Sequence, residues 1–317
     1  MEIAPNPQNV ISVSQIGTIV AQMRKEKWYA SQNIFSLNPY DNFKKLISLY
    51  SISAINKSLS GSFSDGYGNY PTLEKLRNLE IQLPTHNGQI DFDFMESFIA
   101  ELDAERLAEL DAYLQATGLS NYILTAEEEK ILKDFEDGKV DWRKLSITDD
   151  VFDVKNSGNI LSREIIENSW NTPYLCASGE NNGVSSYISY DEESLDEGKC
   201  IFIWGKTFIV TYQEKDFYSN DSHNLILTLK DKDKIKKLNQ IFLVSCIKKS
   251  LGYKYSWWDS ISNKKIQKDE ITLPLKNSEP DYAMMEIFIS AIQKLVIKEV
   301  VLYTDRKIAA TRKVTGL

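Results

Sequence analysis

Apolar residues along this chain follow two patterns, one typical of strands and one typical of helices, and each pattern occurs twice. The segments NVISVSQIGTIVAQ (9–22) and KCIFIWGKTFIVTYQ (199–213) are rich in β-branched and aromatic residues around a central glycine. This composition predicts strands, and the runs NIFSL and NLILTL predict one more strand in each copy. Residues 39–59 and 234–251 instead carry apolar side chains at helical spacing, so a helix is expected to follow each set of strands.

A repeated joint follows each of these helices. The segment IQLPTHNGQIDFDFMESFI (81–99) is echoed by ITLPLKNSEPDYAMMEIFI (271–289), and Pro84 and Pro274 lie 190 residues apart. The Met-Glu and Phe-Ile pairs of the joint recur at the same offset. Solenoid repeats are only a few tens of residues long, so a period near 190 indicates a duplicated domain.

Two long amphipathic helices are predicted after the joints, over residues 89–119 and 279–317, and Gly118 fits the end of the first. The first helix is predominantly acidic and the second predominantly basic, which favours pairing between them over self-pairing. The alternative is that each helix packs on its own domain. The apolar positions expected at a helix-pair interface are Met95, Phe98, Ile99, Leu102, Leu110, Met285, Phe288, Ile289, Ile292, Leu295 and Val296.

The net charge of −8 is concentrated in one stretch of the 317 residues. Residues 101–139 contain eleven acidic and four basic side chains, which leaves seven of the negative charges there. The rest of the chain is close to neutral, so the overall charge does not exclude nucleic acid as a partner. Within this stretch Thr125 and Glu128 have the spacing of a capping box, and Gly138 is expected to end a short helix.

Composition indicates a cytoplasmic protein. No apolar run approaches the roughly 20 residues of a membrane span, and the first residues lack the layout of a secretory signal. The three scattered cysteines, Cys176, Cys200 and Cys246, are typical of buried thiols in a reducing compartment, with a catalytic or ligand role as the alternative. Only two histidines are present, which disfavours a multi-histidine metal centre.

No catalytic motif was found. The segment NPYD (38–41) is one proline short of the Asn/Asp-Pro-Pro-aromatic turn of aminomethyltransferases, and a turn before a helix explains it better. Pro280-Asp281 lacks the Glu-x-Lys partner of a nuclease site, and helix capping is the preferred interpretation. The chain has no P-loop, no Gly-x-Ser-x-Gly and no Cys/His cluster. We therefore expect no catalytic residues, no cofactor and no metal.

Three stretches together resemble the specificity subunit of type I restriction–modification systems. They are DWRKLSITDDVFDVKNSGNILS (141–162), TPYLCASGENNGVSSYI (172–188) and the repeated I-x-L-P with its long helix. GQIDFDFMESFIAELDAERLAELDAYLQATGL (88–119) is especially similar to the related subunits of type IIB and IIG enzymes. The resemblance implies a non-catalytic α+β protein in which two target-recognition domains are joined by two long helices in an antiparallel coiled coil. Each domain would read half of a bipartite site in double-stranded DNA, with methyltransferase subunits and a restriction subunit as partners.

This resemblance predicts five segments. They are a partial first target-recognition domain (1–88), the first long helix (89–119), an acidic linker with a short helix (120–141), the second target-recognition domain (142–278) and the second long helix (279–317). The first domain lacks a counterpart of residues 142–195, so self-association is one way of completing it. The alternative function is a truncated assembly subunit that binds partner subunits without reading two half-sites.

Contacts to DNA require donors on loops, with Lys and Arg for phosphates and amide, hydroxyl or aromatic groups for base edges. The recurring basic and aromatic loops carry the functional prediction, whereas any one of these residues alone could be a solvated loop residue. Trp257 and Trp258 are interpreted as core anchors rather than base stackers. The expected DNA-binding residues are Asn181, Asn182, Gln213, Lys215, Tyr218, Ser219, Asn220, His223, Lys248, Lys249, Tyr253, Lys254, Tyr255, Arg24, Lys25 and Lys27.

Overall fold

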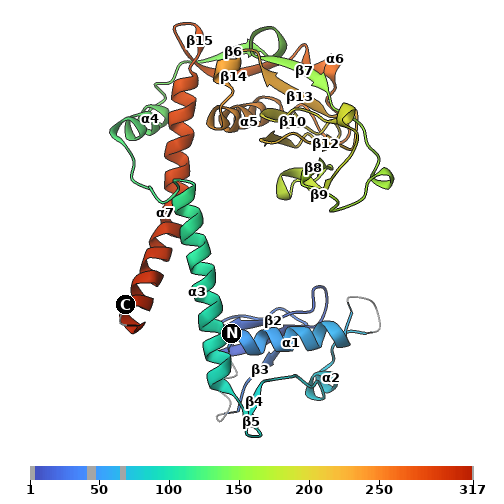
Figure 1. The fold of residues 1–317 in the computed structure, drawn as a ribbon, viewed down its shortest axis with the longest axis vertical. Coiled ribbons are helices and arrows are strands. Elements are labelled where there is room, and N and C mark those ends of the chain that lie inside the picture. Colours follow the sequence, from blue (N-terminus) through green and yellow to red (C-terminus); the bar gives the residue numbers. More distant parts are fainter. Residues whose placement is uncertain (1–3, 41–47, 65–68, 316–317) are drawn as a thin grey trace. The chain divides into compact units, whose positions relative to one another are not determined.

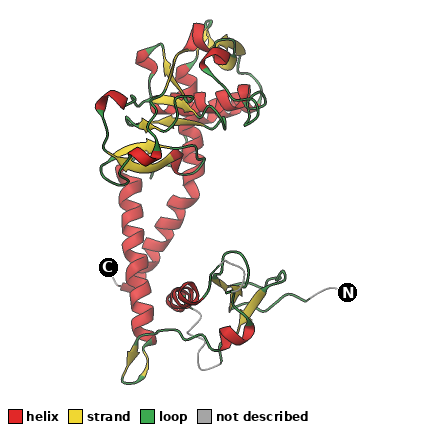
Figure 2. Cartoon of the chain, turned by 90° about the vertical axis from the view of Figure 1, so that its right-hand side faces the viewer, coloured by secondary structure: helices red, strands yellow, loops and turns green. Residues whose placement is uncertain are grey.

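The computed structural model describes residues 4–40, 48–64 and 69–315, the last five of these by their backbone alone. The chain divides into two compact units (Figure 1). Unit 1 consists of residues 1–113 and 306–317, and unit 2 of residues 114–305. Figure 2 shows that both units combine helices with strands, as the α+β prediction requires.

Unit 1 is built on a small antiparallel sheet. Strands β1 (Val10–Ser14), β2 (Ala21–Arg24) and β3 (Ile34–Leu37) lie in the order β2-β1-β3. Helix α1 (Leu49–Ser62) covers the sheet, and its side chains Ile52, Ile55 and Leu59 are buried against the strands. The strands agree with the prediction. The helix expected over 39–59 is observed from Leu49, and residues 41–47 of that range lie outside the described part of the chain.

Unit 2 contains three sheets. The first has the order β11-β10-β13-β7, the second β12-β8-β9 and the third β15-β14-β6. Helix α5 (Lys237–Leu251) packs on β10, β11 and β14 and contributes Phe242, Leu243 and Ile247 to the main core. The strands are β6 (Trp142–Ser146), β7 (Phe152–Asn156), β8 (Thr172–Leu175), β9 (Val184–Ile188), β10 (Cys200–Ile203), β11 (Val210–Gln213), β12 (Tyr218–Ser219), β13 (Leu225–Leu229), β14 (Glu270–Lys276) and β15 (Glu279–Pro280).

The repeat seen in the sequence is also a repeat of structure. Strand β10 begins 190 residues after β1, and the sheet order β11-β10-β13 has the same pairing as β2-β1-β3. Helix α5 then takes the place of α1. Unit 2 has additional strands: β7 pairs with β13, and β6 pairs with β14 over five residues. In the described part of unit 1, β3 has no second neighbour of this kind.

The joint before each long helix has the same hydrogen bonds in both copies. The Asp91 N–H donates to the Pro84 carbonyl at 2.9 Å, and the Asp281 N–H donates to the Pro274 carbonyl at 2.9 Å. Each aspartate side chain accepts the backbone N–H three residues further on, at 2.9 Å and 3.0 Å respectively. Both residues therefore cap a helix N-terminus, which confirms the capping interpretation of Asp281.

A short hairpin precedes each cap, so the long helices begin later than predicted. In unit 1 the hairpin consists of β4 (Thr85–His86) and β5 (Gln89–Ile90), and helix α3 (Phe92–Ala116) follows. In unit 2 strand β15 pairs back onto β14 before helix α7 (Tyr282–Thr315). At 1.5 Å per residue, the 25 residues of α3 and 34 residues of α7 are about 37 Å and about 51 Å long.

The first turns of both helices pack on their own units. Phe98 of α3 lies 5.7 Å from the Tyr50 ring of α1, centroid to centroid. Met285 and Ile289 of α7 belong to the main core of unit 2, and Phe288 lies 5.7 Å from the Phe242 ring of α5. These four of the eleven residues expected at a helix-pair interface therefore have packing partners within their own units.

The acidic linker contains the predicted short helix. Helix α4 (Ala126–Glu136) begins at Thr125 with a complete capping box to Glu128, as predicted, and Gly138 follows its end with a positive φ of 66°. Among the described residues no helix combines the length and apolar character that crossing a membrane would need.

Candidate nucleic-acid interface

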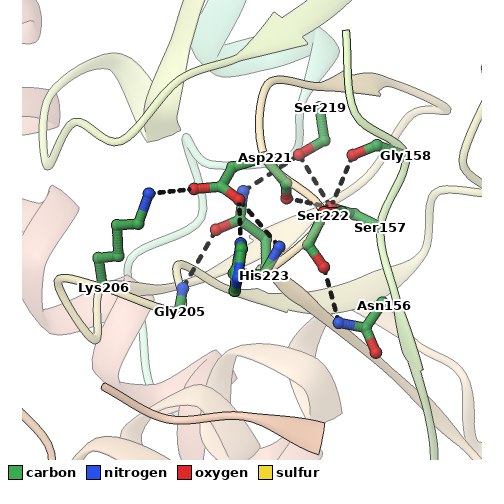
Figure 3. Close-up of polar contacts among 10 residues, drawn as sticks. Asn156, Ser157, Gly158, Gly205, Lys206, Ser219, Asp221, Ser222 and His223 are labelled. Carbon is green, nitrogen blue, oxygen red and sulfur yellow. Dashed lines mark hydrogen bonds and ion pairs between the residues drawn. The ribbon is translucent and has the colours of Figure 1, made fainter. Parts of the chain in front are cut away.

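Three loops of unit 2 meet in one hydrogen-bonded cluster, which we call the loop cluster (Figure 3). Ser157 Oγ, at the end of β7, lies 2.9 Å from Ser219 Oγ and 3.0 Å from the Asp221 carbonyl oxygen, within hydrogen-bond distance of both. Asn224 donates to the same Ser219 hydroxyl at 3.1 Å and accepts the Gly205 N–H at 3.1 Å. These buried groups hold the loops after β7, β10 and β12 in one arrangement.

Asp221 organises the charged surface of the loop cluster. Its carboxylate lies 2.8 Å from Lys206 Nζ and 2.7 Å from His223 Nδ1, and it accepts the His223 backbone N–H at 2.9 Å. Partial burial acts to raise the pKa of Asp221, but hydrogen bonds from Lys206 and His223 outweigh it and lower the pKa to about 2. The Lys206 and His223 side chains remain 54% and 73% exposed, so Lys206 can donate to a ligand and His223 can present its second ring nitrogen.

Asn181 and Asn182 form a tight turn before β9, but their amides are used inside the unit. Asn182 Nδ2 donates to the Tyr212 carbonyl at 2.9 Å and to Gln213 Oε1 at 3.2 Å. Gln213 is 4% exposed, and its own amide donates to the Asn182 carbonyl and to Thr211 Oγ1. The structure thus gives Gln213 a role in holding this turn against β11, rather than a free edge for a base.

Three further predicted contact residues are buried. Ser219 belongs to the loop cluster, and Tyr218 donates from its hydroxyl to the Tyr190 carbonyl at 2.9 Å. Tyr255 donates to the buried carboxylate of Asp269. Their polar groups led to the prediction that these side chains contact DNA, whereas in the structure they form hydrogen bonds within the unit. Lys215 is exposed and Asn220 is half-buried.

Several of the predicted basic residues gather at the end of α5. Lys248 and Lys249 lie in its last turn and are exposed. Lys249, Tyr253 and Lys254 also line a groove of about 670 Å³, together with Trp142 and Phe242. Lys254 pairs with Asp269. The lining of the groove therefore combines aromatic rings with lysines.

Trp257 and Trp258 correct the sequence interpretation. They were expected to anchor the core, but their side chains are 65% and 93% exposed. The large aromatic residue that anchors this stretch is their neighbour Tyr255, which is 4% exposed. The sequence pattern around the two adjacent tryptophans does not indicate whether either side chain is buried.

In unit 1 the predicted residues lie at and after the end of β2. Arg24 donates from Nε to Ser12 Oγ at 2.8 Å, and its guanidinium lies 5.2 Å from the centre of the Trp28 ring. Lys25 and Lys27 are exposed. The corresponding turn of unit 2 carries Lys215, so both copies present basic residues after the same strand.

The described residues contain no group of histidine, cysteine and acidic side chains suited to a metal ion. Cys200 and Cys246 are buried, and burial raises the pKa of both thiols to about 12, as expected for unreactive core cysteines. Cys176 is half-buried rather than buried.

The sequence model of one family matches both copies of the repeated unit. The chain belongs to the family of the type I restriction modification DNA specificity domain, whose sequence model matches residues 3–112 and 139–302. These segments coincide with the two halves of the repeat. The predicted resemblance to this family is thereby confirmed.

Two individual proteins illustrate the relationship. The chain is 28% identical over 145 residues to the specificity subunit S.BcgI of a type II restriction enzyme from Heyndrickxia coagulans. That match covers 45% of this chain and 41% of the relative, so it spans about two fifths of the relative's length. The solved S subunit of a type I restriction–modification system from M. genitalium shares the fold, with a TM-score of 0.55 and 13% identity over 98% of this chain and 82% of that one.

Proposed function

We propose that this chain is a non-catalytic subunit that recognises a bipartite sequence in double-stranded DNA. It positions methyltransferase subunits, and a restriction subunit in the complete system, on that target in the cytoplasm. The observation that carries the proposal is the presence of two matches to one DNA specificity domain, joined to long helices through identical caps. Two similar readers on one chain are suited to a target with two separated halves.

The distribution of charged loops supports DNA as the ligand. In unit 2 the exposed side chains of Lys206, His223, Lys248 and Lys249 can donate hydrogen bonds or contact phosphates, and Lys25 and Lys27 are available in unit 1. Phosphate contacts supply most of the non-specific affinity and position the protein on the duplex. The net negative charge of the chain resides mainly in residues 101–139 and does not oppose this binding.

We further propose that α3 and α7 pair with each other beyond their first turns. The acidic character of α3 and the basic character of α7 support this pairing, because an antiparallel pair would bring unlike charges together. In this arrangement the helix pair sets the separation of the two half-sites and offers a surface to the methyltransferase subunits.

The test is to co-express the chain with the methyltransferase that co-purifies with it and to map modified bases across the genome. We expect modification at one split sequence that disappears when the gene for this chain is deleted. Unchanged modified sites after deletion would contradict the proposal. A matched strain that carries the Asp93→Ala variant, altered at an exposed position in the first turn of α3, should keep the wild-type pattern.

One structural difference between the copies favours a second candidate function. Within the described residues, unit 1 has no counterparts of β6 to β9, although β6 and β7 pair with β14 and β13 in unit 2. A unit without these strands could serve in assembly and leave DNA reading to unit 2 alone, or another copy could complete it. Footprinting distinguishes these functions: protection of two half-sites supports the bipartite reader, and protection of one or none supports the assembly subunit. The mass of the chain in solution reports self-association directly.

A further inference from the structure

Two exposed tryptophans of the basic segment 248–268 lie at the tip of one tight turn. The Ser256 N–H donates to the Asp259 carbonyl at 3.2 Å, and the Asp259 N–H donates back to the Ser256 carbonyl at 3.1 Å. Trp257 and Trp258 occupy the two positions between these hydrogen bonds. A two-residue turn cannot fold its own tip back onto the core, so both indoles project from the surface.

The base of this turn is rigidly anchored. On one side Tyr255 is buried, donates to Asp269 and lies 5.6 Å from the Phe208 ring. On the other side Ile261 is 2% exposed, and its N–H donates to the Gly205 carbonyl at 3.1 Å. Gly205 also belongs to the loop cluster, so the indole turn is continuous with the surface that carries Lys206 and His223.

The turn lies in a lysine-rich segment of the chain. Residues 248–268 contain six lysines and one acidic residue, Asp259, in a chain whose net charge is −8. Asp259 is itself paired with Lys265. A polyanion is the partner that this distribution of charge would attract.

The exposed apolar area is too small to act as a protein interface. Each indole offers on the order of 200 Å² for burial, whereas a stable protein partner covers about 800 Å² on each side. Stacking on nucleic-acid bases requires only the area of one or two rings and is worth about 1–3 kcal/mol for each base of a single strand, while opening a duplex step costs a few kcal/mol that lysine contacts to phosphates can offset. Two projecting indoles among lysines therefore fit bases and phosphates better than a protein surface.

We propose that Trp257 and Trp258 form a stacking wedge that enters a base step of the target duplex while the neighbouring lysines contact phosphates. This inference rests on the proposed function and adds to it a specific mode of contact. A wedge that partly unstacks a step favours steps that open easily, so it would contribute sequence preference without hydrogen bonds to base edges.

The test uses the full chain, with its methyltransferase partner, and a duplex carrying the mapped target. Dissociation constants are measured for Trp257→Ala and Trp258→Ala. Trp170→Ala is the matched control, because Trp170 is 66% exposed but lies outside the basic segment. We expect roughly 5- to 100-fold weaker binding for Trp258→Ala, a smaller loss for Trp257→Ala, recovery in Trp258→Phe and no change for the control.

A second readout distinguishes a wedge from a surface contact. In duplexes with 2-aminopurine placed at successive steps, the wild-type complex should show increased fluorescence at one step, and Trp258→Ala should abolish the increase. The wedge proposal would be overturned if both alanine variants bound DNA with wild-type affinity. It would also be overturned if they lost co-purification with the methyltransferase but kept their affinity for DNA. Either result would leave the proposed function standing. Failure of the wild-type complex to bind any duplex would overturn both.

Discussion

At the scale of single residues, the structure separates polar side chains that build loops from those that can meet a ligand. Gln213, Ser219 and Tyr255 have the chemistry of DNA-contacting residues, yet all three are buried and hydrogen-bonded. The sequence could identify the loops because their residue types are diagnostic. The sequence could not identify which residues of these loops are exposed. Burial depends on contacts with residues elsewhere in the chain, such as that of Tyr255 with Asp269.

Glu128 illustrates a residue whose role was only half predictable. Its capping of α4 follows from local spacing, whereas its contacts to α7 required the fold. Its carboxylate accepts from Lys294 Nζ at 2.8 Å and from Ser290 Oγ at 2.7 Å, and its side chain is 6% exposed. Burial acts to raise the pKa of Glu128, but the hydrogen bonds from Lys294, the Thr125 backbone and Ser290 lower it from 4.5 to about 2.

Replacing this carboxylate should destabilise the protein in a pH-dependent way. Because the folded-state pKa lies below the ordinary value, Glu128 stabilises the fold fully above about pH 4.5. This contribution is lost as the pH falls towards 2. We expect Glu128→Gln to lower the free energy of unfolding by about 3 kcal/mol at pH 7, since it leaves Lys294 without its anion.

Urea denaturation at pH 7 and pH 3 measures both effects. The difference between wild type and Glu128→Gln should shrink at the lower pH. Glu129→Gln removes a neighbouring exposed carboxylate and serves as the control, with little change at either pH. Equal effects of the two substitutions would contradict the role assigned to Glu128.

At the scale of elements, the periodicity of apolar residues was sufficient to predict the strands and helices of the repeated part of the fold. The strands β1, β2, β10, β11 and β13 and the helices α3, α4, α5 and α7 all occur where patterns of apolar residues predicted them. The strands β6 to β9 and β12 were not predicted, because segments such as WRKLS of β6 and TPYL of β8 contain charged residues or proline in place of an uninterrupted β-branched and aromatic run. The hairpin before α3 did have a local signal, Asn87-Gly88, at which both residues adopt positive φ.

The caps of the long helices provide an element-scale prediction. We expect Asp281→Ala to lower the free energy of unfolding by about 1 kcal/mol, because the N–H of Met284 loses its acceptor. Glu299→Ala, an exposed change on the same helix, is the control. Urea denaturation with a conserved m-value checks the difference, and a control variant as unstable as Asp281→Ala would refute the importance of the cap.

At the scale of the whole molecule, the location of charge matters more than its sum. Seven of the eight net negative charges lie in residues 101–139, while residues 248–268 carry a net charge of +5 from six lysines and one aspartate. Both facts could be read from the sequence, as could the family. The sequence could not show that Lys249 and Tyr253 line one groove with Trp142 and Phe288, because these aromatic residues come from β6 and α7, which are distant in the sequence.

Salt dependence of DNA binding tests the charge distribution. We expect the double variant Lys248→Ala/Lys249→Ala to reduce the slope of log K against log salt by about 1.8, since each lost phosphate contact removes about 0.9. Lys232→Ala/Lys234→Ala removes the same charge from exposed positions outside the basic segment and is the matched control. Equal slopes for the two double variants would mean that only the overall charge matters.

Gly205 limits how the proposed recognition surface of unit 2 could be re-engineered. A Cβ at this position would lie 2.3 Å from the His223 carbonyl oxygen, and the Gly205 backbone also bonds to Asn224 and Ile261. A change in one loop would therefore propagate through this residue to the others. Retargeting by grafting would have to transplant residues 156–158, 205–208, 219–224 and 255–261 as a single cassette.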